Sequence, residues 1–372
     1  MHTTNKIIKP FLALTLISLL FVSCGEYEQR STTPDIDDLL SFTATEVFSM
    51  SEVDSIYFSH LGYESVVLEN GNILIPDRQL SNLIVIDDGG NLIKTVRDGR
   101  GPGEIQDAYE FTVDAQGNVY TYDQRNDKIL VFDKDVALLK EVIPVNYEST
   151  SLAKAYPMKD DEWIFELNSF EFLRNEDKER ELFLINYDLS AEGYGEKFTL
   201  NAQPYARLII DGVTRGGRLV PFSGGTISTY NPEEKTLFLF DTSSDLIAEV
   251  NASYDTVNTI PVNLPTEELS QAERDSIRSD HMDEQWKTMQ ELLPEVKAPV
   301  SKMIYHKGEF WMESNILGDS EMWLVLNKEG QITRVVHLPK DSMLMHVSDE
   351  HLGVRLDDVT FALFTNPKPE AL

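Results

Sequence analysis

The sequence contains little cysteine and little positive charge. Cys24 is the only cysteine among 372 residues, which excludes an internal disulfide framework and leaves stability to a packed core. Only 32 Lys and Arg stand against 63 Asp and Glu, and the formal net charge is −31. No block of Lys and Arg is present, although phosphate backbones are bound through such blocks. The sequence therefore predicts no nucleic-acid partner and a soluble, acidic surface.

Common catalytic signatures are also missing. The chain has neither the GxxxxGK[ST] phosphate loop nor the GxSxG nucleophile elbow. Its histidines do not occur at the spacing that a zinc site requires. Asp and Asn are abundant, so calcium is harder to exclude. Two segments, 87–89 and 114–118, resemble parts of calcium loops, but tight turns between strands explain them better. We assign no catalytic or metal-binding residue and favour a role that is not enzymatic.

No apolar run is long enough to span a membrane as a helix. The longest candidate, residues 11–22, follows Lys6 and Lys9, as in a secretory signal. The segment 20–24, LFVSC, resembles the bacterial lipobox, whose cysteine is lipidated and becomes the first residue of the mature chain. We expect residues 1–23 to be a lipoprotein signal peptide and Cys24 to carry the membrane anchor. An incidental cysteine after an ordinary secretory signal is the alternative. Residues 24–40, which are polar and acidic without periodicity, are predicted to form a flexible tether.

Two stretches repeat each other at an offset of 46 residues. GNILIPD at 71–77 matches GNVYTYD at 117–123, and LIVID at 83–87 matches ILVFD at 129–133. Each copy is a turn, a β-rich run, a polar gap and a second β-rich run, at the period of a four-stranded propeller blade. Weaker copies follow at 163–188, 225–241, 308–327 and 352–364. The pattern predicts an all-β fold, a six-bladed β-propeller over 41–372, although five or seven blades also fit.

The last copy has too little sequence for four strands. We predict that the β-prone stretch 47–58 supplies its outer strand, which would close the ring between the two chain ends and remove exposed sheet edges.

One insertion, residues 265–299 between the fourth and fifth blades, interrupts the β pattern. Ser270 and Glu273 have capping-box spacing. A helical apolar stripe follows and ends at Pro294; it consists of Met282, Trp286, Met289 and Leu293. We expect the stripe to pack on the propeller itself, with a partner-binding face as the alternative.

The run 97–104, RDGRGPGE, is the most distinctive segment of the chain. Its glycines permit a sharp turn or a loop that approaches a ligand closely. In a propeller, blade-to-blade connections and the loops between second and third strands share one face. This run and the helical insertion should therefore emerge together, with the helix able to act as a lid over a ligand.

Four residues on that face are the candidate ligand-binding residues. Arg100 and Glu104 belong to the glycine-rich run, and Arg78 and Arg125 occupy equivalent positions in the gaps of the first two blades. Arginines among acidic surroundings suit a carboxylate or an acidic sugar. Local salt bridges, including an Arg100–Glu104 pair, are the alternative.

GRGPGE at 99–104, DAQGNVY at 114–120 and KILVFD at 128–133 resemble the six-bladed β-propeller lipoproteins of diderm bacteria, distant relatives of NHL-repeat propellers. The resemblance, clear over 63–145, implies a lipid-anchored cell-envelope protein, expected at the outer membrane, that binds or scaffolds an envelope protein or a carbohydrate-like ligand. It implies no cofactor and no catalytic residue set. The alternative is a calcium-dependent propeller hydrolase or lyase, lactonase-like or sugar-lyase-like, in which Ca²⁺ would be the cofactor.

Overall fold

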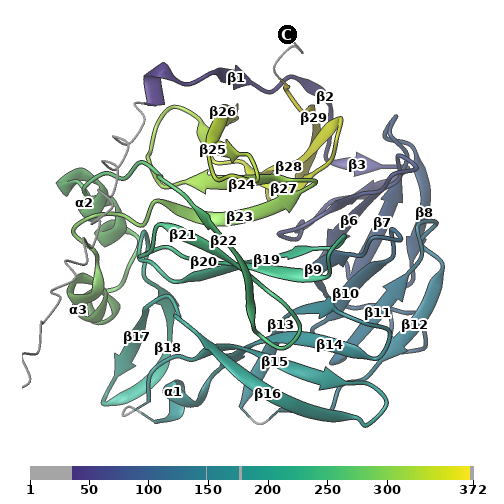
Figure 1. The fold of residues 1–372 in the computed structure, drawn as a ribbon, viewed down its shortest axis with the longest axis horizontal. Coiled ribbons are helices and arrows are strands. Elements are labelled where there is room, and N and C mark those ends of the chain that lie inside the picture. Colours follow the sequence, from purple (N-terminus) through teal and green to yellow (C-terminus); the bar gives the residue numbers. More distant parts are fainter. Residues whose placement is uncertain (1–35, 148, 176–177, 369–372) are drawn as a thin grey trace, which may run out of the picture. The chain divides into compact units, whose positions relative to one another are not determined.

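Six sheets, antiparallel except for one added strand, form the blades of a propeller in this computed structural model, which describes residues 36–147, 149–175 and 178–368 (Figure 1). All described residues belong to the unit Thr33–Leu372. The first strands of neighbouring blades contact one another around the axis, as β9 contacts β13 and β27 contacts β5. The predicted six-bladed fold is confirmed.

The first three blades follow the chain without interruption, with four strands each. Blade 1 contains β5 (Val66–Val67), β6 (Ile73–Asp77), β7 (Asn82–Ile86) and β8 (Leu92–Val96). Blade 2 contains β9 (Ala108–Val113), β10 (Val119–Asp123), β11 (Lys128–Phe132) and β12 (Leu138–Val142). Blade 3 contains β13 (Thr150–Pro157), β14 (Glu162–Ser169), β15 (Leu182–Asp188) and β16 (Gly193–Leu200), with the short helix α1 (Glu171–Arg174) between β14 and β15.

Blade 4 is also continuous in the chain, whereas blades 5 and 6 each include a strand from the beginning of the chain. Blade 4 contains β19 (Thr226–Asn231), β20 (Thr236–Asp241), β21 (Leu246–Val250) and β22 (Thr256–Pro261). Blade 5 contains β23 (Val300–His306), β24 (Glu309–Ser314), β25 (Glu321–Leu326), β26 (Ile332–Leu338) and the parallel strand β1 (Ser41–Thr43). Blade 6 contains β27 (Met343–Val347), β28 (His351–Asp357), β29 (Thr360–Thr365) and β2 (Glu46–Met50).

The core is divided among the six gaps between blades. The second and third strands are buried on both faces, so they read as nearly continuous apolar runs rather than alternating ones. In blade 1, Leu74 and Val85 face blade 2, whereas Ile75 and Ile84 face blade 6. The fourth strands are more exposed, as in β12. This burial explains why the repeat is recognisable mainly in the second and third strands.

The predicted ring closure is present but shorter than expected. Strand β2 pairs antiparallel with β29 and completes blade 6. The rest of the predicted stretch forms a small hairpin of β3 (Glu52–Val53) and β4 (Ile56–Tyr57). Strand β1, which extends blade 5 immediately before β2 begins, was not predicted from the sequence.

The predicted tether is structured at its end. Residues Ile36–Asp38 form a 3-10 helix, and Ile36 and Leu39 pack against the core between blades 4 and 5. The predicted signal peptide, Cys24 and residues 24–35 lie outside the described residues. None of the helices in the described part is sufficiently long and apolar to span a membrane.

The helical insertion packs on the propeller through a hairpin that the sequence analysis missed. Helices α2 (Gln271–Ser279) and α3 (Asp283–Leu292) lie beside β17 (Tyr205–Ile210) and β18 (Val213–Leu219), at the left edge of Figure 1. Ser270 and Glu273 form the predicted capping box. Met289 is fully buried against this hairpin and Trp286 packs beside it, whereas Met282 is 54% exposed. The stripe is therefore a packing surface for most of its length.

Candidate functional site

A cavity of about 700 Å³ lies on the propeller axis. Its walls come from the first strands of all six blades, and its mouth is formed by the loops that follow those strands. We call the side with the loops between first and second strands, and between third and fourth strands, the hairpin face. The opposite side, with the blade-to-blade connections and the loops between second and third strands, is the connection face. The cavity opens on the hairpin face.

Charged side chains gather at the inner end of this cavity. The Lys154 ammonium, on β13, lies 3.8 Å from Glu64 Oε1 and 3.8 Å from Glu110 Oε2. Glu64 Oε2 accepts a hydrogen bond from the Phe111 backbone N–H at 2.8 Å. Lys302, on β23, donates to the Leu344 carbonyl at 2.9 Å. Four charged groups from four blades thus converge on one region, which we call the cavity floor (Glu64, Glu110, Lys154 and Lys302).

The two carboxyl groups of the floor hold their protons differently. Burial, followed by the charge of Glu64, raises the pKa of Glu110 well above its ordinary value of 4.5. Burial acts the same way on Glu64, but the charge of Lys154 and a hydrogen bond from Glu110 outweigh it and lower the pKa of Glu64. Burial opposes the charge on Lys154, yet Tyr156 and the two glutamates raise its pKa well above normal. These shifts favour the charged forms of Lys154 and Glu64 and the protonated form of Glu110.

Other polar groups line the walls and the mouth. The Tyr156 hydroxyl donates to Glu166 Oε2 at 3.2 Å and lies 2.9 Å from Ser228 Oγ. Burial lowers the pKa of His346 to about 3, which keeps its imidazole neutral. At the mouth, Asp349 accepts hydrogen bonds from Lys307 at 2.7 Å and from His306 at 3.1 Å. The Lys307 bond is the main reason that the pKa of Asp349 falls to about 2.

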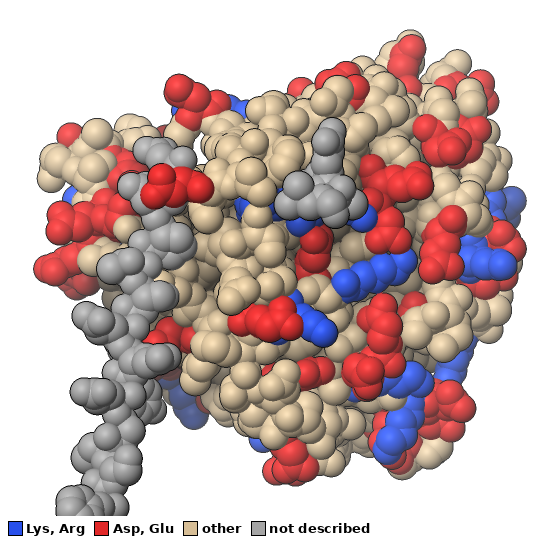
Figure 2. Space-filling model, turned by 45° about the horizontal axis from the view of Figure 1, so that its top comes forward, with Lys and Arg blue, Asp and Glu red and all other residues tan. Residues whose placement is uncertain are grey.

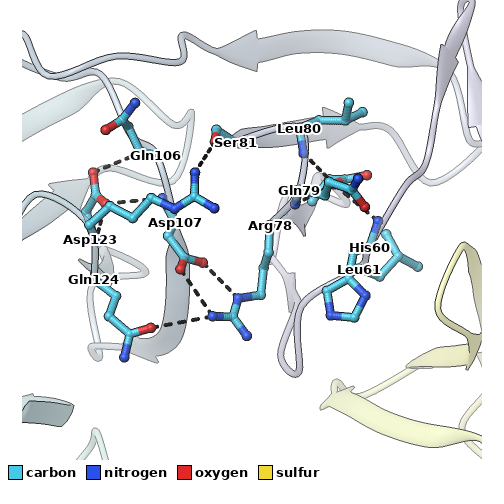
Figure 3. A network of polar contacts seen from close by, with 12 residues as sticks. His60, Leu61, Arg78, Gln79, Leu80, Ser81, Gln106, Asp107, Asp123 and Gln124 are labelled. Atoms are coloured by element: carbon cyan, nitrogen blue, oxygen red, sulfur yellow. Dashed lines mark hydrogen bonds and ion pairs between the residues drawn. The ribbon is translucent and has the colours of Figure 1, made fainter.

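Arg78 lies on the connection face and is already engaged. Its guanidinium forms two hydrogen bonds to the Asp107 carboxylate, at 2.8 and 3.1 Å (Figure 3). The same group lies over the rings of Tyr63 and Tyr109, at 5.5 and 5.1 Å from their centroids. This arrangement ties blade 1 to the entry of blade 2.

Arg125 is not equivalent to Arg78, contrary to our expectation. Arg78 N–H donates to the His60 carbonyl, and the matching bond in blade 2 runs from Gln124 N–H to the Asp107 carbonyl. The 46-residue offset therefore pairs Arg78 with Gln124, whose side chain accepts from Arg78 in Figure 3. Arg125 contacts Ser81 Oγ at 3.4 Å instead.

The glycine-rich run forms a compact turn around a carboxylate. Glu104 Oε2 accepts the Gly101 N–H at 2.7 Å. The Arg100–Glu104 pair that the alternative interpretation included does not form: Glu104 pairs with Arg97 at 3.8 Å, and Arg100 approaches Gln106 at 3.4 Å. These contacts favour the interpretation as an interblade turn.

None of the four predicted ligand-binding residues lines the axial cavity, and neither does any residue of the helical insertion. Sequence reasoning missed the cavity floor. A signal was nevertheless present, because Lys154 and Lys302 each interrupt an otherwise apolar, β-prone segment. Within the described ranges, no group of three or more His, Cys, Asp or Glu side chains is arranged to hold a metal ion. Figure 2 shows acidic side chains scattered over the visible face with basic side chains among them.

Comparisons with known proteins agree with the architecture. Residues 41–199 match the model of a family described as "6-bladed beta-propeller". The chain is a six-bladed β-propeller. No curated protein matches this propeller.

Several solved structures resemble the propeller in fold alone. The protein BF0058 of Bacteroides fragilis NCTC 9343, described as exported, is 14% identical, with 89% of this chain and 100% of that chain covered and a TM-score of 0.49. A member of the duf4221 family from Bacteroides vulgatus ATCC 8482 is 10% identical, with coverages of 87% and 97% and a TM-score of 0.49. BamB from Moraxella catarrhalis is 10% identical, with coverages of 87% and 100% and a TM-score of 0.41. At these levels of similarity the neighbours carry no argument about function.

Proposed function

We propose that this propeller is a lipid-anchored binding module of the cell envelope, whose small-molecule ligand occupies the axial cavity and enters from the hairpin face. The observation that carries the proposal is the cavity floor, where side chains from four blades converge in a space of about 700 Å³. Pockets of roughly 300–1,000 Å³ with a few convergent polar groups are typical of small-molecule sites.

The cavity is better supported as a binding site than the connection face. Arg78 and Glu104 already form ion pairs or hydrogen bonds within the protein. A ligand would have to displace these contacts before binding there. In the cavity, by contrast, Lys154 lines the wall, and its ammonium group makes no hydrogen bond to another described residue, because its two carboxylate neighbours both lie 3.8 Å away. Polar groups inside a protein normally have partners, so a molecule in the cavity would complete this site. No observation favours the calcium-dependent hydrolase or lyase over this binding role.

Binding can be tested by thermal shift on the full chain in mild detergent, with a panel of neutral sugars, uronates, amino acids and dicarboxylates. A ligand that binds the folded state raises the unfolding temperature. Ala115 is exposed in a hairpin-face turn of blade 2 and lines the cavity mouth. Ala191 is exposed in a turn of blade 3 but does not line the cavity. We expect Ala115→Trp to abolish the shift and Ala191→Trp to preserve it. Absence of any shift across the panel, or a shift that survives Ala115→Trp, would overturn the proposal.

The lipid anchor needs a separate test. Cys24→Ser is expected to release the protein from the membrane fraction or to leave it as an unprocessed precursor, as judged by fractionation and intact mass. Unchanged membrane retention with normal cleavage would contradict lipidation at Cys24. Separation of inner and outer membranes would then test the proposed location at the outer membrane.

A further inference from the structure

The two ammonium groups of the cavity floor have N–H donors that no described residue accepts. An ammonium group carries three N–H donors. Lys154 makes no hydrogen bond to another described residue, because its two carboxylate neighbours both lie 3.8 Å away. Lys302 uses one donor on the Leu344 carbonyl. The Lys154 side chain keeps 27% of its surface exposed, although its neighbourhood is the interior of the propeller. These donors face the cavity and would be satisfied by an acceptor-rich molecule.

The charges of the floor point the same way. Lys154 and Lys302 both act electrostatically on Glu64 and on Glu110, so both ammonium groups lie near the same carboxyl pair. The raised pKa of Glu110 favours its neutral form, which reduces the negative charge that the pair sets against the two ammonium groups. Glu166, on β14 behind the cavity lining, is already hydrogen-bonded by Tyr156 and Ser228. The inner end of the cavity is therefore suited to an added anion.

We propose that the axial cavity binds a small monocarboxylate, whose carboxylate lies between the ammonium groups of Lys154 and Lys302. This inference rests on the proposed function and names its ligand class. The body of the ligand would lie against the walls nearer the mouth, where Phe111, Ile304 and Tyr305 provide apolar surface. The mouth carries the exposed acids Glu69, Glu233 and Glu350. Their repulsion disfavours phosphate esters and other multiply charged anions.

The test uses two pairs of probes that differ in the carboxylate alone, D-glucuronate with D-glucose and 4-hydroxybenzoate with 4-hydroxybenzyl alcohol. Isothermal titration calorimetry with the full chain in mild detergent measures each affinity. We expect at least one carboxylate to bind tenfold or more tightly than its neutral counterpart. Inorganic phosphate should compete weakly, and equal binding of phosphate would overturn the carboxylate class.

Three variants locate the charge effect. Lys154→Met and Lys302→Met each remove one ammonium group, and each should weaken carboxylate binding tenfold or more with little effect on the neutral partner. Lys328→Met is the control, because Lys328 is exposed outside the cavity. Circular dichroism and thermal unfolding verify that the variants are folded. If Lys154→Met does not fold, Lys302→Met alone still tests whether an ammonium group of the cavity floor binds the carboxylate.

The outcomes separate this inference from the proposed function. The inference would be overturned if the probes bound with equal affinity with and without a carboxylate, or if neither lysine substitution changed the affinity for the carboxylates. If Ala115→Trp still abolished that binding, the axial cavity would remain the binding site for a different ligand class. If Ala115→Trp also left the binding unchanged, both the inference and the proposed function would be overturned.

Discussion

Glu64 and Glu110 are chemically identical side chains beside the same lysine, yet the pKa of Glu64 is lowered and that of Glu110 is raised well above its ordinary value. Burial raises the pKa of both, but at Glu64 the charge of Lys154 and a hydrogen bond from Glu110 outweigh it, with a smaller contribution from the Phe111 N–H, whereas at Glu110 the charge of Glu64 adds to burial. A carboxylate that accepts hydrogen bonds is stabilised in its charged form. The buried neighbour therefore keeps its proton, and folding becomes sensitive to pH.

Glu110→Gln should flatten the loss of stability above pH 4.5. The native state holds the Glu110 proton, whereas the unfolded chain releases it near the ordinary value of 4.5. The free energy of unfolding must then fall as pH rises toward the native pKa, by up to about 1.4 kcal/mol per pH unit. Urea unfolding between pH 5 and pH 8 measures this slope. Glu69→Gln, at an exposed position, is the control. A variant with the wild-type slope would contradict the assignment of the proton.

At His346 we expect the opposite pH dependence, with stability lost as the pH falls. Its native pKa of about 3 lies below the ordinary value of 6.5, because burial disfavours the imidazolium. The unfolded chain takes up a proton below pH 6.5 and the native state does not, so stability is lost as pH falls from 6.5 toward 3. His346→Gln should remove up to about 1.4 kcal/mol of that loss per pH unit. The same urea titrations measure it, with His60→Gln as the control. Equal acid slopes in the wild type and in His346→Gln would exclude a buried neutral imidazole.

Element-scale structure depends on how closely the turns of one blade approach the next. Gly330, in the last turn of blade 5, has a φ of +81°. A Cβ atom there would lie 2.0 Å from the Pro261 carbonyl oxygen at the end of β22. Gly308 has a similar φ of +88°, but open space surrounds the place of its Cβ. The two glycines share a left-handed backbone conformation, but only Gly330 lies in contact with the neighbouring blade.

Gly330→Ala should therefore destabilise the propeller more than Gly308→Ala. Both substitutions pay the cost of a left-handed residue, about 1 kcal/mol. Only Gly330→Ala must also separate blade 4 from blade 5, which should add about 1–3 kcal/mol. Urea unfolding gives both values, and equal losses would show that the turn moves without disturbing its neighbour.

A buried lysine links the helical insertion to blade 5. Lys297, just before β23, is 2% exposed and pairs with Glu267 and with Glu273, at 2.7 Å for the latter. Glu273 also closes the capping box of α2. One side chain thus holds the N-terminus of α2 against the strand entry.

Lys297→Met should destabilise the insertion by about 1–3 kcal/mol, since it leaves two carboxylates without their cation. Partial exposure of Glu267 limits the penalty. Hydrogen exchange should show increased opening of 265–299 with blade 2 unchanged. Lys159→Met breaks an exposed pair with Glu162 and should cost less than about 1 kcal/mol. Exchange rates in 265–299 that stay at wild-type values would show that the ion pair does not secure the insertion.

The limits of sequence reasoning are also clearest at the element scale. The repeat predicted β6, β7, β10 and β11, because strands buried on both faces conserve an apolar run and end at the same turn. The hairpin β17–β18 was missed because it belongs to no repeat. The cavity floor was missed for another reason: Glu64, Lys154 and Lys302 come from different blades, and only ring closure brings them together.

At the scale of the whole molecule, the ring of blades is closed by strand pairing between the two ends of the described chain. Strand β2, near the beginning of the described chain, pairs with β29 near its end. The adjacent β1 covers the outer strand of blade 5. Without these two strands, β26 and β29 would present unpaired edges, and the apolar residues between blades 6 and 1 would lose support from Phe48 and Met50.

A chain that begins at Glu52 should therefore fail to fold cooperatively, whereas one that begins at Ile36 should retain the fold. The shorter chain loses both β1 and β2, and with them the pairing that joins the ends of the ring. The longer chain keeps every described element. Circular dichroism and thermal unfolding should show a sharp transition only for the chain from Ile36, and size-exclusion chromatography should show aggregation of the shorter one through its open edges. If the chain from Glu52 unfolded cooperatively at the wild-type temperature, the six blades would be held by the interfaces between neighbours alone, and the two terminal strands would serve only to cover sheet edges.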